Sequence, residues 1–511
     1  MKKPDSSAHQ LKTIQSERNL ARGSKHESKA ARSTAKQRQR ASARCSHADQ
    51  VRELLQWLFP EDGIFAKFQL HGNTGWRVSG LIWLALCWSW SGSPQVTDAF
   101  TQAAEWCRLT IGESPVLTYQ GMMSALVHWT ESFLPVLWSV LHLRMQEVAG
   151  KLWSVDGWVP IAIDGSRSSA PRSKSNEHAL CAPTYGTGKT AKYRKKKSQG
   201  MRRRKNEKNK AQPQEPQAWI TLLWHMSLRL PWMWRLGPSN ASERAHAMDM
   251  LATGEFPQNT LFCGDAGFVG YPLWSLITQR GQRFLVRVGA NVRLLTERTD
   301  CLVRCDGGRV LCWPKTAQDA QLPPLELRLV KVLIGRQRMW MLTNVVQSWR
   351  LTPEQIVNFY RLRWGIEVGF RGLKQTLDHA QLCCRNSQRL MTELHWALLG
   401  MTIAELLALK EQLALTPAAA RYEPKKRSLA HTMRALRFCL QHLREVPQSD
   451  DDLKSRLRRA VTDSYVRRSS KTARYRPCNP DKKSLGDPHI RRLTPSEQKT
   501  LKTLTLRKSA A

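Results

Sequence analysis

The stretch from Asn358 to Leu377, NFYRLRWGIEVGFRGLKQTL, decides how the rest of the chain is interpreted. It carries Tyr360, Arg363, Glu367 and Lys374 at spacings of 3, 4 and 7 residues. At roughly 100° per residue, four side chains spaced in this way fall within about 60° of one another on a helix. The pattern therefore predicts one helical face with an aromatic hydroxyl, two cations and a carboxylate. Such a carboxylate suits a divalent cation, and the two cations suit phosphates.

The same stretch also fits a plain helix that is stabilised by ion pairs. Glu367 lies four residues from both Arg363 and Arg371, and pairs at this spacing stabilise a helix by about 0.2–0.5 kcal/mol each. The interleaved apolar residues, which we expect to be buried, are Leu362, Trp364, Ile366 and Phe370. The rest of the chain decides between the two interpretations.

The charge of the chain points to a polyanionic partner. Its 511 residues allow two or three domains, and 80 Lys and Arg against 41 Asp and Glu give a net charge of +39. Nucleic acid is the commonest polyanion that such a surface binds. The 12 cysteines include no C-x-x-C pair, so neither a disulfide framework nor a zinc site is predicted, and reduced thiols fit a cytosolic protein.

The N-terminal part has two regions of contrasting composition. Residues 1–50 hold 12 Lys and Arg against 4 Asp and Glu, net +8, which predicts a disordered basic arm that either contacts phosphates or only aids solubility. Residues 51–150 carry apolar residues at helical spacing, which predicts a helical domain that either binds DNA or only packs. Its most apolar run, Leu81 to Trp90, is ten residues long. About twenty residues are needed to cross a bilayer, so we expect a buried helix and no membrane segment.

Two short apolar runs each lead to an aspartate. VPIAI, residues 159–163, suits a buried strand and precedes Asp164, and a strand over residues 261–263 precedes Asp265 in GDAGF. Asp156 is a rival to Asp164, but it comes before the strand. We therefore expect two carboxylates at strand ends.

Three further segments complete the chain. Residues 185–210 hold 12 Lys and Arg and one acid, net +11, and predict a basic surface insertion. Their GTGKT lacks both the earlier glycine of a phosphate-binding loop, because Pro183 stands there, and a leading apolar strand. From about 290 to 345, short runs alternate between apolar and polar residues, which predicts a β-rich insertion. The C-terminal region, 401–511, is predicted to be helical and then basic, ending either in a DNA-binding segment or in a solvated tail.

Asp164, Asp265 and Glu367 are almost evenly spaced, by 101 and then 102 residues. Phosphoryl transfer with two divalent metals needs carboxylates that converge from separate elements of the fold. Two strand ends and one helix can supply them. The three acids are therefore the candidate catalytic and metal-binding residues.

These motifs resemble those of the Insertion Sequence 4 family of DDE transposases. The pattern Y-x2-R-x3-E-x6-K, which begins at Tyr360, matches that family's helical motif position for position. IDGS around Asp164 and GDAGF around Asp265 look like its two aspartate motifs. The resemblance covers about residues 155–400.

The resemblance implies an α/β chain with an RNase H-like catalytic core over residues 155–400. Such a core has a mixed sheet, helices on both faces, and the three acids at one edge. It also implies two Mg²⁺ (or Mn²⁺) ions, of which one activates the attacking oxygen and the other stabilises the leaving oxygen. The implied reaction is cleavage at the ends of a bacterial insertion sequence, followed by strand transfer into target DNA.

The resemblance also implies partners and DNA contacts. The partners are the terminal inverted repeats, target DNA and a second protomer, in the bacterial cytoplasm at the nucleoid. Tyr360, Arg363 and Lys374 would contact DNA. Trp340 lies 20 residues before Tyr360, where some relatives stack a Trp on a flipped base, although in a chain with 20 tryptophans it is equally well explained as a core residue.

Two departures from the family leave alternatives open. The basic insertion and the N-terminal helical region are unusual, so the region that recognises the element ends is not assigned. An inactive or domesticated DNA-binding descendant is one alternative. A related metal-dependent DNA nuclease without strand transfer is another.

Overall fold

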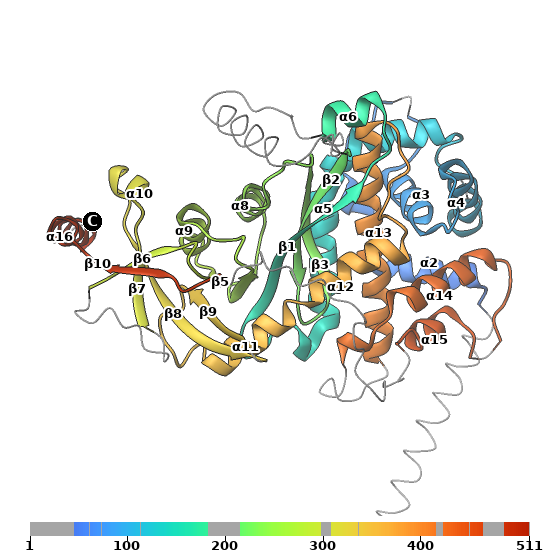
Figure 1. The fold of residues 1–511 in the computed structure, drawn as a ribbon. Coiled ribbons are helices and arrows are strands. Elements are labelled where there is room, and N and C mark those ends of the chain that lie inside the picture. Colours follow the sequence, from blue (N-terminus) through green and yellow to red (C-terminus); the bar gives the residue numbers. More distant parts are fainter. Residues whose placement is uncertain are drawn as a thin grey trace, which may run out of the picture.

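The computed structural model describes residues 45–509 except 61, 73, 113, 182–214, 298–307, 336, 415–422, 449 and 463–484. The basic insertion at 185–210 and nearly all of the basic arm at 1–50 therefore lie outside the described residues. The described part is an α/β protein. Helices gather at one end of the molecule, and a long sheet extends toward the other (Figure 1).

The described strands form one ten-stranded sheet in the order β10-β6-β7-β8-β9-β5-β4-β1-β2-β3. Their bounds are β1 Val159–Ser169, β2 Gln217–His225, β3 Leu230–Gly237, β4 Thr260–Gly264, β5 Arg283–Val288, β6 Arg293–Thr296, β7 Gly308–Cys312, β8 Leu325–Ile334, β9 Gln337–Thr343 and β10 His489–Arg492. The strands β1, β4 and β5 are parallel neighbours, whereas β1, β2 and β3 form an antiparallel meander. The segment expected as a β-rich insertion supplies β6 to β9, which continue this sheet beyond β5.

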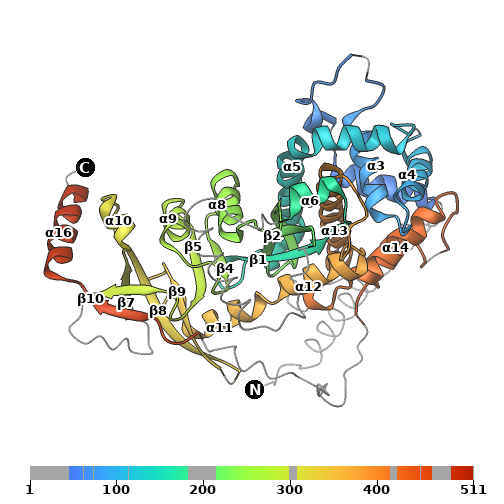
Figure 2. The same cartoon turned by 45° about the horizontal axis from the view of Figure 1, so that its top comes forward.

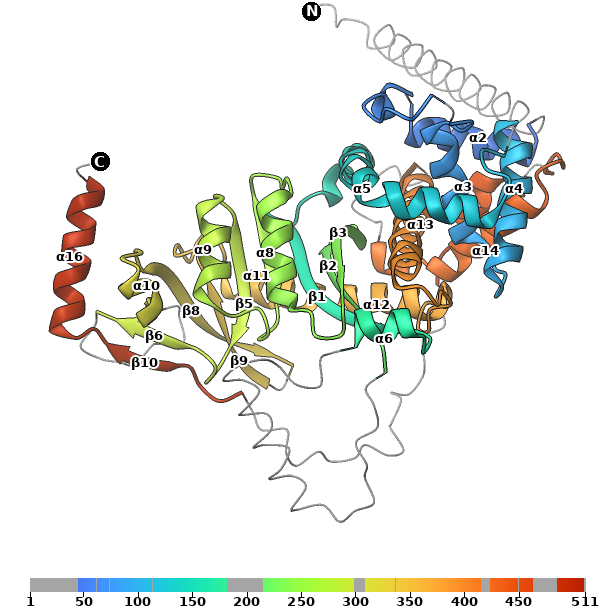
Figure 3. The same cartoon turned by 90° about the horizontal axis from the view of Figure 1, so that it is seen from above.

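The described helices include short 3-10 and π turns. Their bounds are α2 His47–Leu58, η1 Asp62–Phe65, α3 Val78–Trp90, α4 Val96–Ile111, α5 Tyr119–Ala149, η2 Gly150–Leu152, α6 Lys174–Leu180, α8 Glu243–Thr253, α9 Tyr271–Gln279, α10 Lys315–Asp319, α11 Pro353–Leu362, α12 Gly365–Arg371, η3 Gly372–Thr376, α13 Ser387–Ala414, η5 Pro424–Lys426, α14 Leu429–Gln441, α15 Leu453–Arg458 and α16 Pro495–Ser509. The helices α8 and α9 cover one face of the sheet, and α11 and α12 lie on the other (Figure 3).

Helix α13 forms the centre of the helical end of the molecule. It packs against α3 and α5 from the N-terminal part and against α14 and α15 from the C-terminal part. Figure 2 shows α3, α5, α13 and α14 together. By length and apolar composition α13 resembles a membrane-spanning helix, but 89% of its most apolar window is buried inside the protein. It is therefore the core helix around which the helical segments assemble, because its apolar surface is buried on all sides.

The stretch predicted as one helix from 358 to 377 is broken into three pieces. α11 ends at Leu362, and at Trp364 and Ile366 the backbone N–H groups donate to carbonyls three residues back. α12 then runs to Arg371, and the π-helical turn η3 follows it. Trp364, expected to be buried, is 55% exposed, because the break rotates it away from the sheet.

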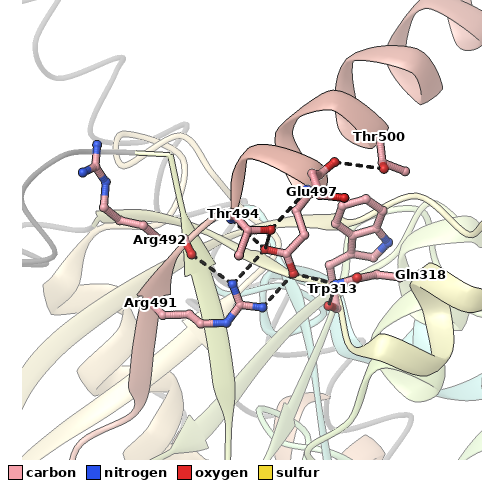
Figure 4. A network of polar contacts seen from close by, with 8 residues as sticks. Trp313, Gln318, Arg491, Arg492, Thr494, Glu497 and Thr500 are labelled. Atoms are coloured by element: carbon pink, nitrogen blue, oxygen red, sulfur yellow. Dashed lines mark hydrogen bonds and ion pairs between the residues drawn. The ribbon is translucent and has the colours of Figure 1, made fainter.

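The C-terminal segment attaches to the far edge of the sheet. β10 pairs in parallel with β6, and α16 follows. The Glu497 carboxylate accepts hydrogen bonds from the Arg491 guanidinium at 2.7 and 2.8 Å and from the Gln318 amide at 3.1 Å (Figure 4). One carboxylate thus joins β10, α16 and the segment of α10.

Candidate active site

Strand β1 carries Asp164 in its interior, and not at its end as predicted. β4 pairs with β1 only along residues 159–162, whereas β2 pairs with it as far as Ser169. The side of β1 that faces β4 therefore has no partner strand from Ile163 to Ser168, and at Ser169 it makes only an isolated bridge to Gln381. Residues 159–163 are buried and Asp164 is half-buried, so the carboxylate lies where the parallel strands open.

Alternate residues of β1 face different helices. Asp164 and Ser166 contact the side that carries α11, α12 and η3, whereas Gly165 faces α8. This follows from the two-residue period of a strand, which sends neighbouring side chains to opposite faces of the sheet. The site can therefore be approached from both faces of β1.

Arg363 is the main partner of Asp164. Its Nη1 donates to Asp164 Oδ2 at 3.3 Å, and the Arg363 side chain is only 6% exposed. The guanidinium lies over the rings of Tyr360, at 5.2 Å, and Trp364, at 5.8 Å. The alternative that Arg363 pairs with Glu367 is wrong, since the break after α11 turns Arg363 inward onto β1.

Tyr360 and Lys374 are likewise directed inward. Tyr360 is 4% exposed. Lys374, on the π turn η3, donates from Nζ to Ser166 Oγ at 2.8 Å, and partial burial lowers its pKa. The cations predicted to lie on an open helical face thus anchor α11, α12 and η3 to β1.

Asp265 directly follows β4, as predicted. Its Oδ1 accepts the Gly267 N–H at 2.7 Å, and the Phe268 N–H donates to the Asp265 carbonyl at 3.2 Å. The tight turn leaves little room at Gly267, where a Cβ would lie 3.0 Å from Asp265 Oδ1. The GDAGF motif is therefore a turn that fixes the direction of this carboxylate.

The electrostatics connect the three predicted acids. Burial raises the pKa of Asp164; the Gly165 N–H and Arg363 oppose this rise, and the negative charges of Asp265 and Glu367 add to it. Glu367 itself is exposed on α12. The structure thus brings Asp265 and Glu367 within electrostatic range of Asp164, from three separate elements.

A fourth acid in this region was not predicted. Glu243 is the first residue of α8, and its pKa is raised to about 7 by burial and by the negative charges of Asp164 and Asp265. In the sequence it is indistinguishable from an ordinary acid in the first turn of a helix, where acids are common because they interact well with the helix dipole. Only the packing of α8 on β1 reveals its neighbours.

The donor set has the chemistry of a site for a hard divalent cation, since every candidate ligand is a carboxylate oxygen. Within the described ranges, no three His, Cys, Asp or Glu side chains are grouped closely enough to hold a metal ion. Arg363 occupies Asp164 Oδ2. The residues therefore fit a cation by type and by charge, and the Arg363 pair has to open before Asp164 can serve as a ligand.

Trp340, predicted to stack on a base, is on β9, three strands from β1. Its Nε1 donates to Asp487 Oδ1 at 2.6 Å, and Lys331 Nζ lies 4.8 Å from the centre of its ring. No described contact joins it to the acids.

Comparison with known proteins gives a match to a protein family and several similar solved structures. Residues 159–403 match the family described as "Transposase DDE domain", so this domain identifies the enzyme as a DDE transposase. One of the similar structures is a cryo-EM structure of the piggyBac transposase synaptic complex with hairpin DNA. Its TM-score is 0.35 at 10% identity, covering 85% of this chain and 88% of that chain. No curated protein matches the chain.

Proposed function

We propose that this DDE transposase cuts DNA at the ends of a bacterial insertion sequence and joins the freed ends to target DNA. The observation that carries the proposal is the match of residues 159–403 to the transposase DDE domain, within which Asp164 lies on β1, Asp265 directly follows β4 and Glu367 lies on α12. Carboxylates are rarely brought together on three separate elements without a functional reason, because their charges repel.

In this proposal Asp164, Asp265 and Glu367 hold two Mg²⁺ or Mn²⁺ ions. Bound ions would activate the attacking oxygen and stabilise charge on the phosphate during nicking and strand transfer. The chain itself orients the carboxylates. The Gly165 N–H holds Asp164 Oδ1 at 2.9 Å, and the Gly267 N–H holds Asp265 Oδ1.

Arg363 and Lys374 are proposed to bind phosphates of the strand being cut. When Asp164 turns to a cation, Arg363 loses its partner and can donate to a phosphate with two N–H groups. Lys374 donates a hydrogen bond to Ser166, which lies two residues after Asp164 on β1. Tyr360 supplies the ring beneath Arg363, and contact of its own with DNA requires its side chain to leave the core.

Trp340 is proposed to contact DNA only after its hydrogen bond to Asp487 opens. This contact belongs to the hairpin route of cleavage. The alternative is a structural role for Trp340, in which its ring contacts Lys331 and its Nε1 binds Asp487 of the C-terminal segment, without DNA.

The fold supports an RNase H-like core around the site. Strands β3-β2-β1-β4-β5 form a mixed sheet, with helices packed on both faces. The acids lie where β4 ends beside β1. The remaining strands, β6 to β10, extend this core on the side of β5.

The net charge of +39 supports DNA as the partner, through phosphate contacts and counterion release. We further propose that two protomers act on two paired ends, in the bacterial cytoplasm at the nucleoid. Sedimentation of the protein with DNA from the flanking inverted repeats should give two protomers per complex. A cleavage-competent complex with one protomer would contradict this.

The reaction is tested by incubating the purified chain with end DNA, Mg²⁺ and a target plasmid. The proposal predicts both cut ends and ends joined to the plasmid. Cutting without joining would identify a nuclease, and binding without cutting an inactive descendant.

A further inference from the structure

A pocket of about 200 Å³ lies beside α12 and includes none of the three predicted acids. Its walls come from the turn between β2 and β3, from α12 and η3, from α13 and from the start of α14. The polar and charged side chains that line it include Arg229, Arg371, Gln375, Thr376, Glu405 and Arg427. The pocket thus gathers cations from three separate segments of the chain around one space.

Arg229, in the turn between β2 and β3, is held in the pocket wall. Its backbone has a φ of 55°, a left-handed conformation that is uncommon for residues other than glycine. Arg427 stabilises the turn in this form, because its Nη2 donates to the Leu228 and Arg229 carbonyls at 2.9 Å each. The Arg229 side chain is half-buried, and its guanidinium group makes no hydrogen bond or ion pair with any described residue.

The charges that line the pocket are unbalanced. The acid among them, Glu405, accepts a hydrogen bond from Arg427 Nε. Burial and the positive charge of Arg427 lower the pKa of Arg229, and Glu405 offsets this only in part. Arg371, exposed on α12, also has no ion pair within the described part of the chain. Three positive charges therefore face one negative charge, which favours an anionic ligand.

Helix α14 begins in the same pocket, which residues 428–430 line. Ser428 Oγ accepts the His431 N–H at 3.4 Å. The N–H groups of Leu429 and Ala430 have no acceptor among the described residues. A Cβ at Gly372 would lie 2.8 Å from Leu429 Cδ2, so only glycine lets α14 begin this close to η3. Such N–H groups, at the positive end of the helix dipole, bind anions.

A buried donor on β2 points to the same space independently of the helix. Trp224 lines the pocket and is 4% exposed, and its Nε1 has no hydrogen-bond partner among the described residues. A Cβ at Gly365 would lie 3.5 Å from Trp224 Nε1 and 4.0 Å from Arg229 Cζ. The indole N–H and the guanidinium group therefore border one gap. Buried donors are normally paired, so this N–H is suited to a ligand with oxygen acceptors.

We propose that this pocket binds a phosphate group. Arg229 and Arg371 supply guanidinium groups, each of which can donate two parallel N–H bonds to phosphate oxygens. The start of α14 supplies backbone N–H groups, and the phosphate offsets the excess positive charge. Two sources carry this chemistry, a backbone phosphate of DNA and the free phosphate ion. A backbone phosphate here would attach DNA to α12, the helix that carries Glu367.

The first experiment titrates inorganic phosphate into the full chain without DNA and measures binding by calorimetry. Arg229→Met and Arg371→Met should each weaken phosphate binding by about tenfold or more, because each removes a charged hydrogen-bond donor. Arg108→Met is the matched control, since Arg108 is exposed on α4, outside the pocket, and its loss changes the net charge equally. Its phosphate binding should match wild type, as should that of the charge-conserving Arg229→Lys within about threefold.

A purely structural role for Arg229 predicts a different result. In that case Arg229→Met would melt at a lower temperature than wild type in phosphate-free buffer and would bind phosphate as wild type does. The phosphate site predicts an equal or higher melting temperature, because the variant loses a half-buried cation that has no ion pair among the described residues. Arg371 is exposed, so Arg371→Met tests the site without disturbing the turn.

The second experiment identifies the source of the phosphate group, by titrating a DNA duplex of arbitrary sequence between 50 and 200 mM salt. A backbone phosphate predicts that Arg229→Met and Arg371→Met each reduce the salt slope by about one, with Arg108→Met unchanged. A free phosphate ion predicts unchanged slopes with weakened binding of inorganic phosphate. Neither assay involves cleavage, so the outcome is independent of the proposed active site. Wild-type behaviour of both pocket variants in both assays would overturn the inference.

Discussion

Gly369 is where the helix that carries Glu367 comes closest to the sheet. A Cβ at Gly369 would lie 2.5 Å from Cζ3 and 2.6 Å from Cη2 of Trp224, a buried residue of β2. The indole ring is rigid and surrounded, so it cannot move aside cheaply. Gly369→Ala should therefore push α12 away from β2 and move Glu367 away from Asp164.

Gly365 is the matched control, because it faces the same indole from the start of α12. Its Cβ would lie 3.5 Å from Trp224 Nε1, an ordinary contact. Both alanines gain up to about 1 kcal/mol in helix propensity, whereas overpacking costs about 1–3 kcal/mol and applies only at 369. We expect Gly369→Ala to be less stable than Gly365→Ala by about 1–3 kcal/mol.

Urea unfolding measures this difference, and cleavage of end DNA reports the position of Glu367. Gly369→Ala should cleave more slowly, and adding Trp224→Leu should restore part of both stability and cleavage. Equal stability of the two alanine variants, within about 0.5 kcal/mol, would refute the packing argument.

Three further results are expected. Arg363→Met and Lys374→Met should each reduce the salt slope of end-DNA binding by about one, measured by titration between 50 and 200 mM salt; an unchanged slope would exclude the phosphate contact. Arg491, the Thr494 N–H and Gln318 lower the pKa of Glu497 to about 2 from 4.5. The stability this gives to the β10–α16 attachment is complete above about pH 4.5 and is lost as the pH falls toward 2. Amide exchange of residues 489–497 should follow that window, and Glu497→Gln should remove the dependence. Chelation of divalent cations should abolish cleavage, with DNA binding retained and Mg²⁺ restoring activity; cleavage in excess chelator would contradict the metal role.

Local patterns predicted the positions of the acids well. The apolar run before Asp164 is indeed the start of β1, and Asp265 does follow β4 directly. Such runs are informative because a strand buried on both faces excludes polar residues until it reaches an opening. The end of β1 was missed because residues after Asp164 are polar yet still pair with β2.

Contacts between distant segments could not be predicted. Arg363 pairs with Asp164, 199 residues away, whereas helical spacing offered Glu367 as its nearest partner. The break between α11 and α12 makes this contact possible. It contains no proline, and Trp364 at the start of α12 makes no side-chain capping bond, so the sequence carries no signal that predicts the break. Tertiary packing on β1 overrides the local pattern.

Glu243 illustrates the same limit at the site itself. Glu243 is the first residue of α8, which ends at Thr253. Whether its first acid faces solvent or Gly165 depends on how α8 lies on β1. In the sequence, only the glycine at position 165 reflects this contact, and its purpose becomes clear only when Glu243 is seen packed against it.

The most direct test of the account is cleavage of end DNA by Glu367→Gln beside wild type, with DNA binding measured on the same samples. Glutamine keeps the size of the side chain and removes its charge, so α12 should pack unchanged. The account predicts that cleavage falls by more than about a thousandfold while end-DNA affinity stays within about threefold of wild type. Cleavage at the wild-type rate by Glu367→Gln would contradict the assignment of the active site.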